Sequence, residues 1–431
     1  MFPFEWVREP RWRRQAARVA AIEINPDIIQ PALSVQRAWN KSRGILRGCR
    51  EGGALIEDHI REVLDEAGRL VDVGETGRRI FGAEEMRAHV WTPEEHLAAY
   101  GRSHPEDSVV AWVGNGDLLS NPHFVAFEAA PEGGTLYHLS SETLYLSPSG
   151  RCYSSLVVRK PGCEPRVSIE SVYFDSGEGI PQVYSADGQC ITAEVECATY
   201  GQRLVHRGRA IDDEDIIRMA REGAFYDLRH LFLFGRVETG DNCWIDAGLA
   251  GFWDAEGRLD TAAVERALRG EPISADVRQF PAESVRSAMD AKGYDEASEP
   301  AAIGQYSLRD GLLRVVLRRG IYPHSMMGIR PDDRLISVAL EGLSNRAGVT
   351  LRGAADIMKT LGAEEAILID NGADVTMSIG GNVVLSSAEG RRNKLRSLIL
   401  FRTKGRPRRL LDQDLRLIDH PPQYAATRGK P

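Results

Sequence analysis

The spacing of apolar residues predicts helices in the first part of the chain and short strands in the next. Apolar positions recur at helical period over Gly53–Val71 and more weakly over Leu33–Trp39, and Thr92-Pro93 is typical of a helix start. We therefore expect residues 1–105 to be mainly helical. Residues 106–199 hold short β-branched or aromatic runs between turn-forming residues, which predicts a β-rich segment. Its predicted strands are 109–113, 123–127, 143–146, 154–158 and 191–195.

Residues 200–401 mix both patterns. Amphipathic helices are predicted at 212–222 and 351–361, and Gly362 is the residue type expected just after a helix. Ala366–Ile369 is apolar on both faces, which predicts a fully buried strand. Further strands are predicted at 231–237, 312–319, 335–340 and 398–401, with a hairpin of 375–379 and 383–386 turning at Gly380–Asn382. The mixture predicts an α/β fold with α+β character, in which residues 200–401 form the C-terminal domain.

Composition narrows the classes of protein to consider. The chain has 54 Lys and Arg against 62 Asp and Glu, a net charge of −8, with 42% hydrophobic residues, as in ordinary globular proteins. At about 150 residues per domain, 431 residues predict two or three domains. Negative charge argues against a nucleic-acid partner, and no apolar run reaches the ~18–20 residues of a membrane span. The tail, 402–431, is basic, with eight Lys and Arg against three Asp, and we interpret it as a partly ordered, solvated extension.

The number and spacing of the cysteines indicate the redox environment of the protein. Six are present, at 49, 152, 163, 190, 197 and 243, and none has zinc-finger spacing. Disulfides 152–163 and 190–197 are one interpretation. Reduced thiols are favoured, because Met1–Arg18 has five Arg but no apolar segment with a cleavage site. We therefore expect a cytoplasmic protein.

The strongest candidate site follows the buried strand. Ile369 is followed directly by Asp370, Asn371, Gly372, Ala373 and Asp374. Carboxylates at the carboxyl end of a buried strand are a common active-site arrangement, and a glycine there allows close approach of a ligand. Asp370 and Asp374 are candidate acid and base. A structural Asx turn, or a divalent cation held by Asp370, Asn371 and Asp374, remains an alternative; we expect no other metal or cofactor.

Four segments resemble, in order, motifs of the phosphodiester glycosidase family. Trp244–Arg258 resembles INGGFFDPDGR, Tyr322–Ile329 resembles PRTAIG, and Asp332–Val338 resembles DGRLLLV. Val349–Met377 resembles the helix GLTL…ELAELMKELG followed by LDGGGSSTM. The resemblance covers roughly residues 200–401 and implies an α/β domain of that family.

The motifs also depart from the family pattern. In DGGGS the first Asp and one Gly are kept, as Asp370 and Gly372, whereas Asp374 takes the place of the hydroxyl residue. His324 replaces the Arg of PRTAIG, and a His cannot pair bidentately with phosphate as an Arg does. Ser325 replaces its Thr, and the Asn of NGG falls on Asp246 or Leu249. A site that loses Arg and gains carboxylates favours a neutral or cationic substrate.

The resemblance implies hydrolysis of a sugar–O–phosphate bond at the anomeric centre by carboxylate acid/base chemistry. The expected catalytic residues are Asp370, Asp374, His324 and Asp246. The expected substrate-binding residues are Asn371, Gly372, Ser325, Arg346 and Trp253; Arg346 is equally a surface residue, and Trp253 fits a core position as well as a sugar platform. The partner is a small-molecule substrate, with a homo-oligomer left open. The alternatives are a family member repurposed for a non-sugar substrate in specialised metabolism, and a non-catalytic ligand-binding protein.

Overall fold

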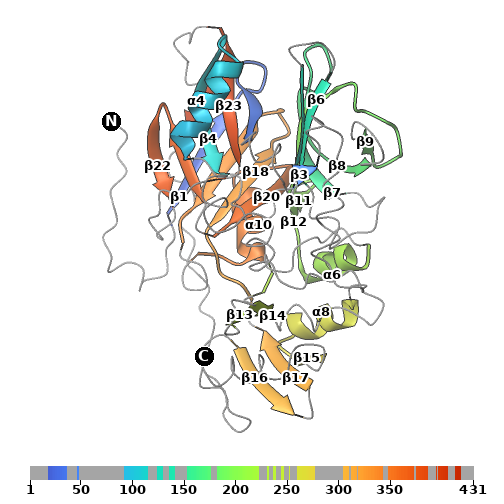
Figure 1. Cartoon of the computed structure of the whole chain (residues 1–431). Helices are drawn as coiled ribbons and strands as arrows, with labels where there is room; N and C mark the ends of the chain where they lie inside the picture. Colours follow the sequence, from blue (N-terminus) through green and yellow to red (C-terminus); the bar gives the residue numbers. More distant parts are fainter. Residues whose placement is uncertain are drawn as a thin grey trace.

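The computed structural model is mainly β, with helices packed on the outer faces of its sheets (Figure 1). The structure describes residues 18–35, 46–47, 92–114, 124–129, 135–140, 153–175, 182–222, 231–232, 236–238, 244–246, 252, 260–276, 304–309, 312–317, 319–342, 348–372, 375–386, 395, 397–405 and 413–418. None of the described helices is both long enough and apolar enough to cross a membrane.

A seven-stranded antiparallel sheet forms the centre. Across the sheet its strands are β12 (Arg209–Ala210), β11 (Gln202–His206), β20 (Glu365–Asn371), β18 (His324–Ile329), β19 (Leu335–Leu340), β1 (Val19–Ile24) and β24 (Leu415–Leu417). The N-terminal strand β1 therefore lies between β19 and the strand contributed by the tail, β24.

A five-stranded sheet covers one face of this central sheet. Its strands are β2 (Gln30–Val35), β23 (Ser397–Lys404), β4 (Asp107–Gly114), β21 (Thr376–Ile379) and β22 (Asn382–Ser386). Aliphatic side chains from both sheets, including Ile22, Met327 and Phe401, form one continuous core between them. The helix α4 (Pro93–Ser103) packs through Tyr100 on β2, β4 and β23.

Helices cover the opposite face of the central sheet. They are α10 (Leu351–Thr360), α6 (Asp213–Glu222) and α8 (Thr261–Leu268), and they bury a second core that includes Met326, Leu368 and Ile357. Thr350 caps α10 by accepting a hydrogen bond from the Gly353 backbone N–H.

A third sheet of seven strands joins the edge of the central sheet. Its strands are β3 (Leu46–Arg47), β6 (Thr135–Ser140), β5 (Phe124–Ala129), β10 (Val195–Tyr200), β7 (Tyr153–Arg159), β8 (Val167–Asp175) and β9 (Gln182–Ser185). Gly201 connects β10 directly to β11, and its N–H donates to the Ser154 carbonyl at 2.9 Å. Two small sheets complete the described part, namely β13 (Arg236–Glu238) with β14 (Trp244–Asp246), and β15 (Ile273–Asp276) with β17 (Leu312–Leu317) and β16 (Gly304–Arg309).

The expected α/β class is corrected to a mixed but mainly β fold. The described strand pairs between named strands are all antiparallel. Ala366–Ile369 is apolar on both faces because helices cover one side of its sheet and a second sheet covers the other. This burial gives an antiparallel strand the continuous apolar pattern of a parallel one.

Several predicted elements are confirmed and three are wrong. The helices at 92, 212 and 351, the buried strand at 366 and the Gly380-Gly381 hairpin are present. Leu33–Val35 belongs to β2 instead of a helix, because this segment pairs along β23. Residues 191–194 form a turn in which the Glu194 N–H donates to the Ile191 carbonyl, and residues 231–237 contain a turn and one bridge before β13 begins. The predicted helix 53–71 and strand 143–146 lie outside the described residues, and the division at 105, 199 and 401 stays a prediction.

The described cysteines are free thiols. Cys163, Cys190 and Cys197 have no disulfide partner, which rules out the alternative pairing of residues 190 and 197. Burial raises the pKa of the Cys197 thiol, so this group is unreactive.

Candidate active site

Two of the predicted motifs meet in the central sheet, where β18 begins and β20 ends. Because the two strands are antiparallel, Ser325 lies opposite Asp370 and His324 lies opposite Asn371. The histidine-containing motif and the carboxylate-containing motif, distant in the sequence, therefore lie side by side where β18 begins and β20 ends. We call this place the β18–β20 edge.

A bulge and a turn shape this edge. Met326 pairs with Leu368 and Ser325 with Asp370, so Ile369 is an extra residue in β20. Such a bulge redirects the side chains at the end of a strand. Gly372 follows with a φ of 94°, and its N–H donates to the Pro323 carbonyl at 3.2 Å. That backbone conformation favours glycine, as the sequence predicted.

His324 is fully buried at 0% exposure. Its Nε2 lies 2.9 Å from the carbonyl oxygen of Val349, just before the cap of α10. A carbonyl oxygen only accepts, so Nε2 carries a proton and donates it to Val349. The ring is thus oriented by the segment that leads into α10.

Asp370 is also buried, at 4% exposure, and its Oδ1 accepts a hydrogen bond from the Asn371 backbone N–H at 2.8 Å. Ser325 Oγ and Asn371 Nδ2 are buried, and neither has a hydrogen-bond partner among the described residues. Buried polar atoms without a partner cost about 1–3 kcal/mol each and are therefore rare outside functional sites. The edge combines a buried carboxylate with a hydroxyl and an amide donor that have no hydrogen-bond partner among the described residues.

For the remaining predicted residues the structure describes no side-chain position. Asp246 is the last residue of β14, opposite Arg236, and the structure does not describe its side chain. Asp374, Arg346 and Trp253 lie outside the described residues. Within the described ranges, no three His, Cys, Asp or Glu side chains are placed to hold a metal ion. The divalent cation beside Asp370 and Asp374 stays a prediction.

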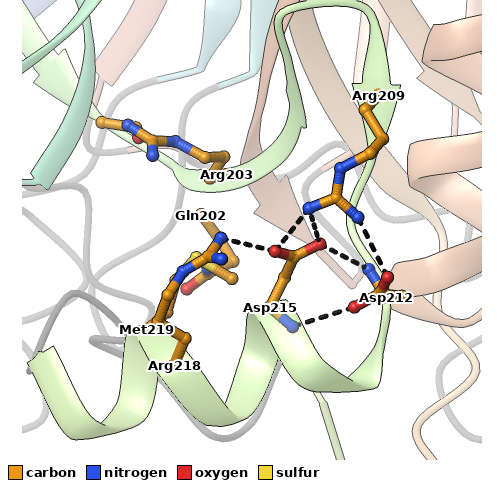
Figure 2. A network of polar contacts seen from close by, with 8 residues as sticks. Gln202, Arg203, Arg209, Asp212, Asp215, Arg218 and Met219 are labelled. Carbon is orange, nitrogen blue, oxygen red and sulfur yellow. Dashed lines mark hydrogen bonds and ion pairs between the residues drawn. The ribbon is translucent and has the colours of Figure 1, made fainter.

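A cavity of about 260 Å³ opens elsewhere, between α6, β11 and β12 of the central sheet and β7 and β8 of the third sheet. At its base Asp212 and Asp215 cap α6 reciprocally: each side chain accepts from the other's backbone N–H, at 3.1 and 2.9 Å (Figure 2). The sequence predicted the helix at 212–222, but Arg203 and Arg218, which also line the cavity, were missed. The available indication was Arg203, a lone charge inside the strand Gln202–Val205.

Solved structures with related sequences are distant. The catalytic domain of zebrafish N-acetylglucosamine-1-phosphodiester alpha-N-acetylglucosaminidase, auto-inhibited by its pro-peptide, is 11% identical over 70% of this chain and 89% of that chain, with a TM-score of 0.25. A putative exported protein from Burkholderia pseudomallei K96243 is 14% identical over 68% of this chain and 39% of its own, with a TM-score of 0.26. A hypothetical protein from Synechocystis is 10% identical over 90% of this chain and 59% of its own, with a TM-score of 0.25. No curated protein sequence matches this chain.

The family comparison covers the candidate edge. The sequence model of the family described as phosphodiester glycosidase matches residues 268–402, which include β18, α10 and β20. The match starts later than the expected residue 200, so the motif around Asp246 lies before it. Residues 268–402, about a third of the chain, therefore resemble the phosphodiester glycosidase family in sequence.

Proposed function

We propose that this chain is a hydrolase that cleaves a sugar–phosphodiester-type bond at the edge formed by β18 and β20, with Asp370 as its acid/base. The observation that carries the proposal is the direct pairing of Ser325 with Asp370. Both residues lie inside the segment that matches the phosphodiester glycosidase family.

The chemistry follows from the groups present. The Asp370 carboxylate, oriented by the Asn371 N–H, takes a proton from the water that attacks the anomeric carbon. A new carbon–oxygen bond forms as the bond between the anomeric carbon and the phosphate oxygen breaks, and the phosphate monoester leaves as an anion. Ser325 Oγ and Asn371 Nδ2 supply donors for substrate hydroxyl or phosphate oxygens.

The experiment is a turnover assay of the full chain. Release of free sugar is measured from a sugar 1-phosphodiester and from a matched glycoside that lacks phosphate. Asp370→Asn keeps an oxygen to accept from Asn371 but removes the base, so turnover is expected to fall by about 100-fold or more. Asp332→Asn, on the turn between β18 and β19 with a 61% exposed side chain, is the matched control and should keep full turnover. Full activity of folded Asp370→Asn would refute the assignment.

A non-catalytic ligand-binding protein on the same scaffold is the second candidate. One observation favours it: the ring of His324 is buried and hydrogen-bonded to the Val349 carbonyl, and it cannot pair bidentately with phosphate as the Arg of the family motif can. The same observation fits a family member repurposed for a non-sugar substrate. Binding of the substrate panel without turnover, lost on Asn371→Ala, would support the binding protein; turnover of a phosphate-free substrate alone would support repurposing.

Other expectations remain predictions. The same turnover assay, applied to single substitutions, tests two further roles. These are catalysis by Asp374 and Asp246, and substrate binding by Arg346 and Trp253. A cytoplasmic location, a homo-oligomer and a divalent cation are further proposals for this chain.

A further inference from the structure

The cavity beside α6 has the size and the charged lining of a ligand site. None of its lining residues belongs to the β18–β20 edge. Its lining includes three guanidinium groups, from Arg203, Arg209 and Arg218, against the two carboxylates of Asp215 and Glu222. A volume of about 260 Å³ has room for a small anionic group with a few further heavy atoms.

Arg203 is held rigidly by two hydroxyl groups. Its Nε and Nη2 donate to Ser154 Oγ and Ser171 Oγ, each at 2.8 Å. The two serines are direct cross-strand partners on β7 and β8, so their spacing is fixed by the sheet. Each hydroxyl accepts from Arg203 and keeps its own O–H to donate. The guanidinium and the two hydroxyls form one donor surface.

Three carboxylates, of Glu365, Glu222 and Asp215, act on the charge of Arg203 without a direct contact. Arg203 forms no ion pair with any residue that the structure describes, and desolvation by burial lowers its pKa. A guanidinium remains charged all the same, since its ordinary pKa lies far above neutrality. A half-buried cation of this kind is stabilised by any anion that reaches it.

The nearest strong carboxylate is already engaged. Asp215 is 2% exposed and accepts from Arg209 at 2.6 Å, from Arg218 at 2.5 Å and from the Asp212 backbone N–H. Figure 2 shows the Arg203 side chain extending away from this network. Two arginines thus share one carboxylate, and neither Asp215 nor Glu222, the two carboxylates of the lining, forms a direct ion pair with Arg203.

We infer that this cavity binds a small molecule through an oxyanion, a phosphate or carboxylate group, on the guanidinium of Arg203 and the hydroxyls of Ser154 and Ser171. The Nη1–Nη2 end of the guanidinium takes two oxygens side by side, as arginine does with both groups. Arg218, whose side chain is 59% exposed, adds a second positive charge to the lining of the cavity. The site is independent of the proposed hydrolase activity.

The test is titration calorimetry of the full chain at low ionic strength with inorganic phosphate, glycerol 3-phosphate and malonate as separate arms. Saturable binding in any arm is expected, and the arm that binds more tightly identifies the anion. Arg203→Gln should weaken binding by about 10- to 100-fold, the value of hydrogen bonds to a charged group. Arg221→Gln, on the same helix with a 63% exposed side chain outside the lining, is the matched control and should bind like the native chain.

A second variant separates loss of the anion site from misfolding of the protein. Ser171→Ala leaves the cation in place and removes one donor, so it should weaken binding by several fold while thermal unfolding stays cooperative. Absence of binding in all three arms would overturn the inference. Equal affinity of Arg203→Gln and the native chain, or an equal loss in Arg221→Gln, would overturn it as well.

Discussion

Acidification is expected to lower the free energy of unfolding through a single buried residue, His96. This residue lies in α4 and is 0% exposed. Its Nδ1 lies 3.0 Å from Ser34 Oγ on β2, and its Nε2 lies 2.8 Å from the Leu395 carbonyl. Burial, the largest effect, lowers the pKa of His96 from 6.5 to about 4. The ring therefore joins α4 to its sheet as a neutral group.

The magnitude follows from proton linkage. In the unfolded chain His96 takes up a proton near pH 6.5, whereas in the folded chain it stays neutral down to about pH 4. The unfolded state thus binds more protons in this window, so stability falls as the pH falls. The contribution is complete above pH 6.5 and is lost towards pH 4. At about 1.4 kcal/mol per pH unit, the total loss is about 3 kcal/mol, and about 2 kcal/mol is already lost at pH 5.

Urea unfolding at pH 7.5, 6, 5 and 4.5 measures this loss. His96→Gln keeps a donor for the Leu395 carbonyl but does not titrate, so its free energy of unfolding should fall less steeply by about 2 kcal/mol between pH 7.5 and 5. Arg102→Gln, at an exposed position in the last turn of α4, removes no group that titrates in this pH range, so it is the control and should retain the native pH dependence. Parallel pH profiles for the native chain and His96→Gln would refute the reasoning.

Three further predictions concern stability and use the same urea assay. Gly201→Ala places a Cβ 2.5 Å from the backbone oxygen of Leu368, so it should lower the free energy of unfolding by about 1–3 kcal/mol; an unchanged value would contradict the close packing of β11 on β20. Gly101→Ala, inside α4 with open space around it, should raise the free energy by about 0.5–1 kcal/mol, and a loss would show a hidden contact. Glu23→Gln weakens a buried carboxylate that pairs with Arg330 at 2.6 Å and with two other arginines, so a loss of about 2 kcal/mol is expected at low salt and less at high salt.

The sequence predicted correctly those elements whose conformation depends on residues close by in the chain. The cap at Thr92, the helix that starts at Leu351 and the two-glycine hairpin depend on neighbouring residues, and all three are present. Leu33–Val35 was misassigned because its conformation depends on pairing with β23, whose residues are far away in the sequence. The buried run Ala366–Ile369 identified a strand but not its direction, since burial on both faces looks the same in parallel and antiparallel sheets.

The candidate site was predictable only in part. The sequence identified His324 and Asp370 as candidate residues. Their adjacency depends on the register of β18 against β20, and no sequence pattern predicts the bulge at Ile369. The Arg203 cavity was missed because its serines belong to β7 and β8, and no spacing rule connects those strands with β11.

The position of β1 has a consequence for how the chain is synthesised. Val19 pairs with Leu340 and Ile22 with Leu417, so β1 leaves the ribosome long before either partner strand exists. At about 5–20 residues per second, this wait lasts on the order of tens of seconds. Throughout that time an apolar strand has both edges unpaired, a state prone to wrong pairing with other chains. The central sheet is therefore completed only after β24 has been synthesised, and nascent-chain binding factors can reach the unpaired edges of β1 until then.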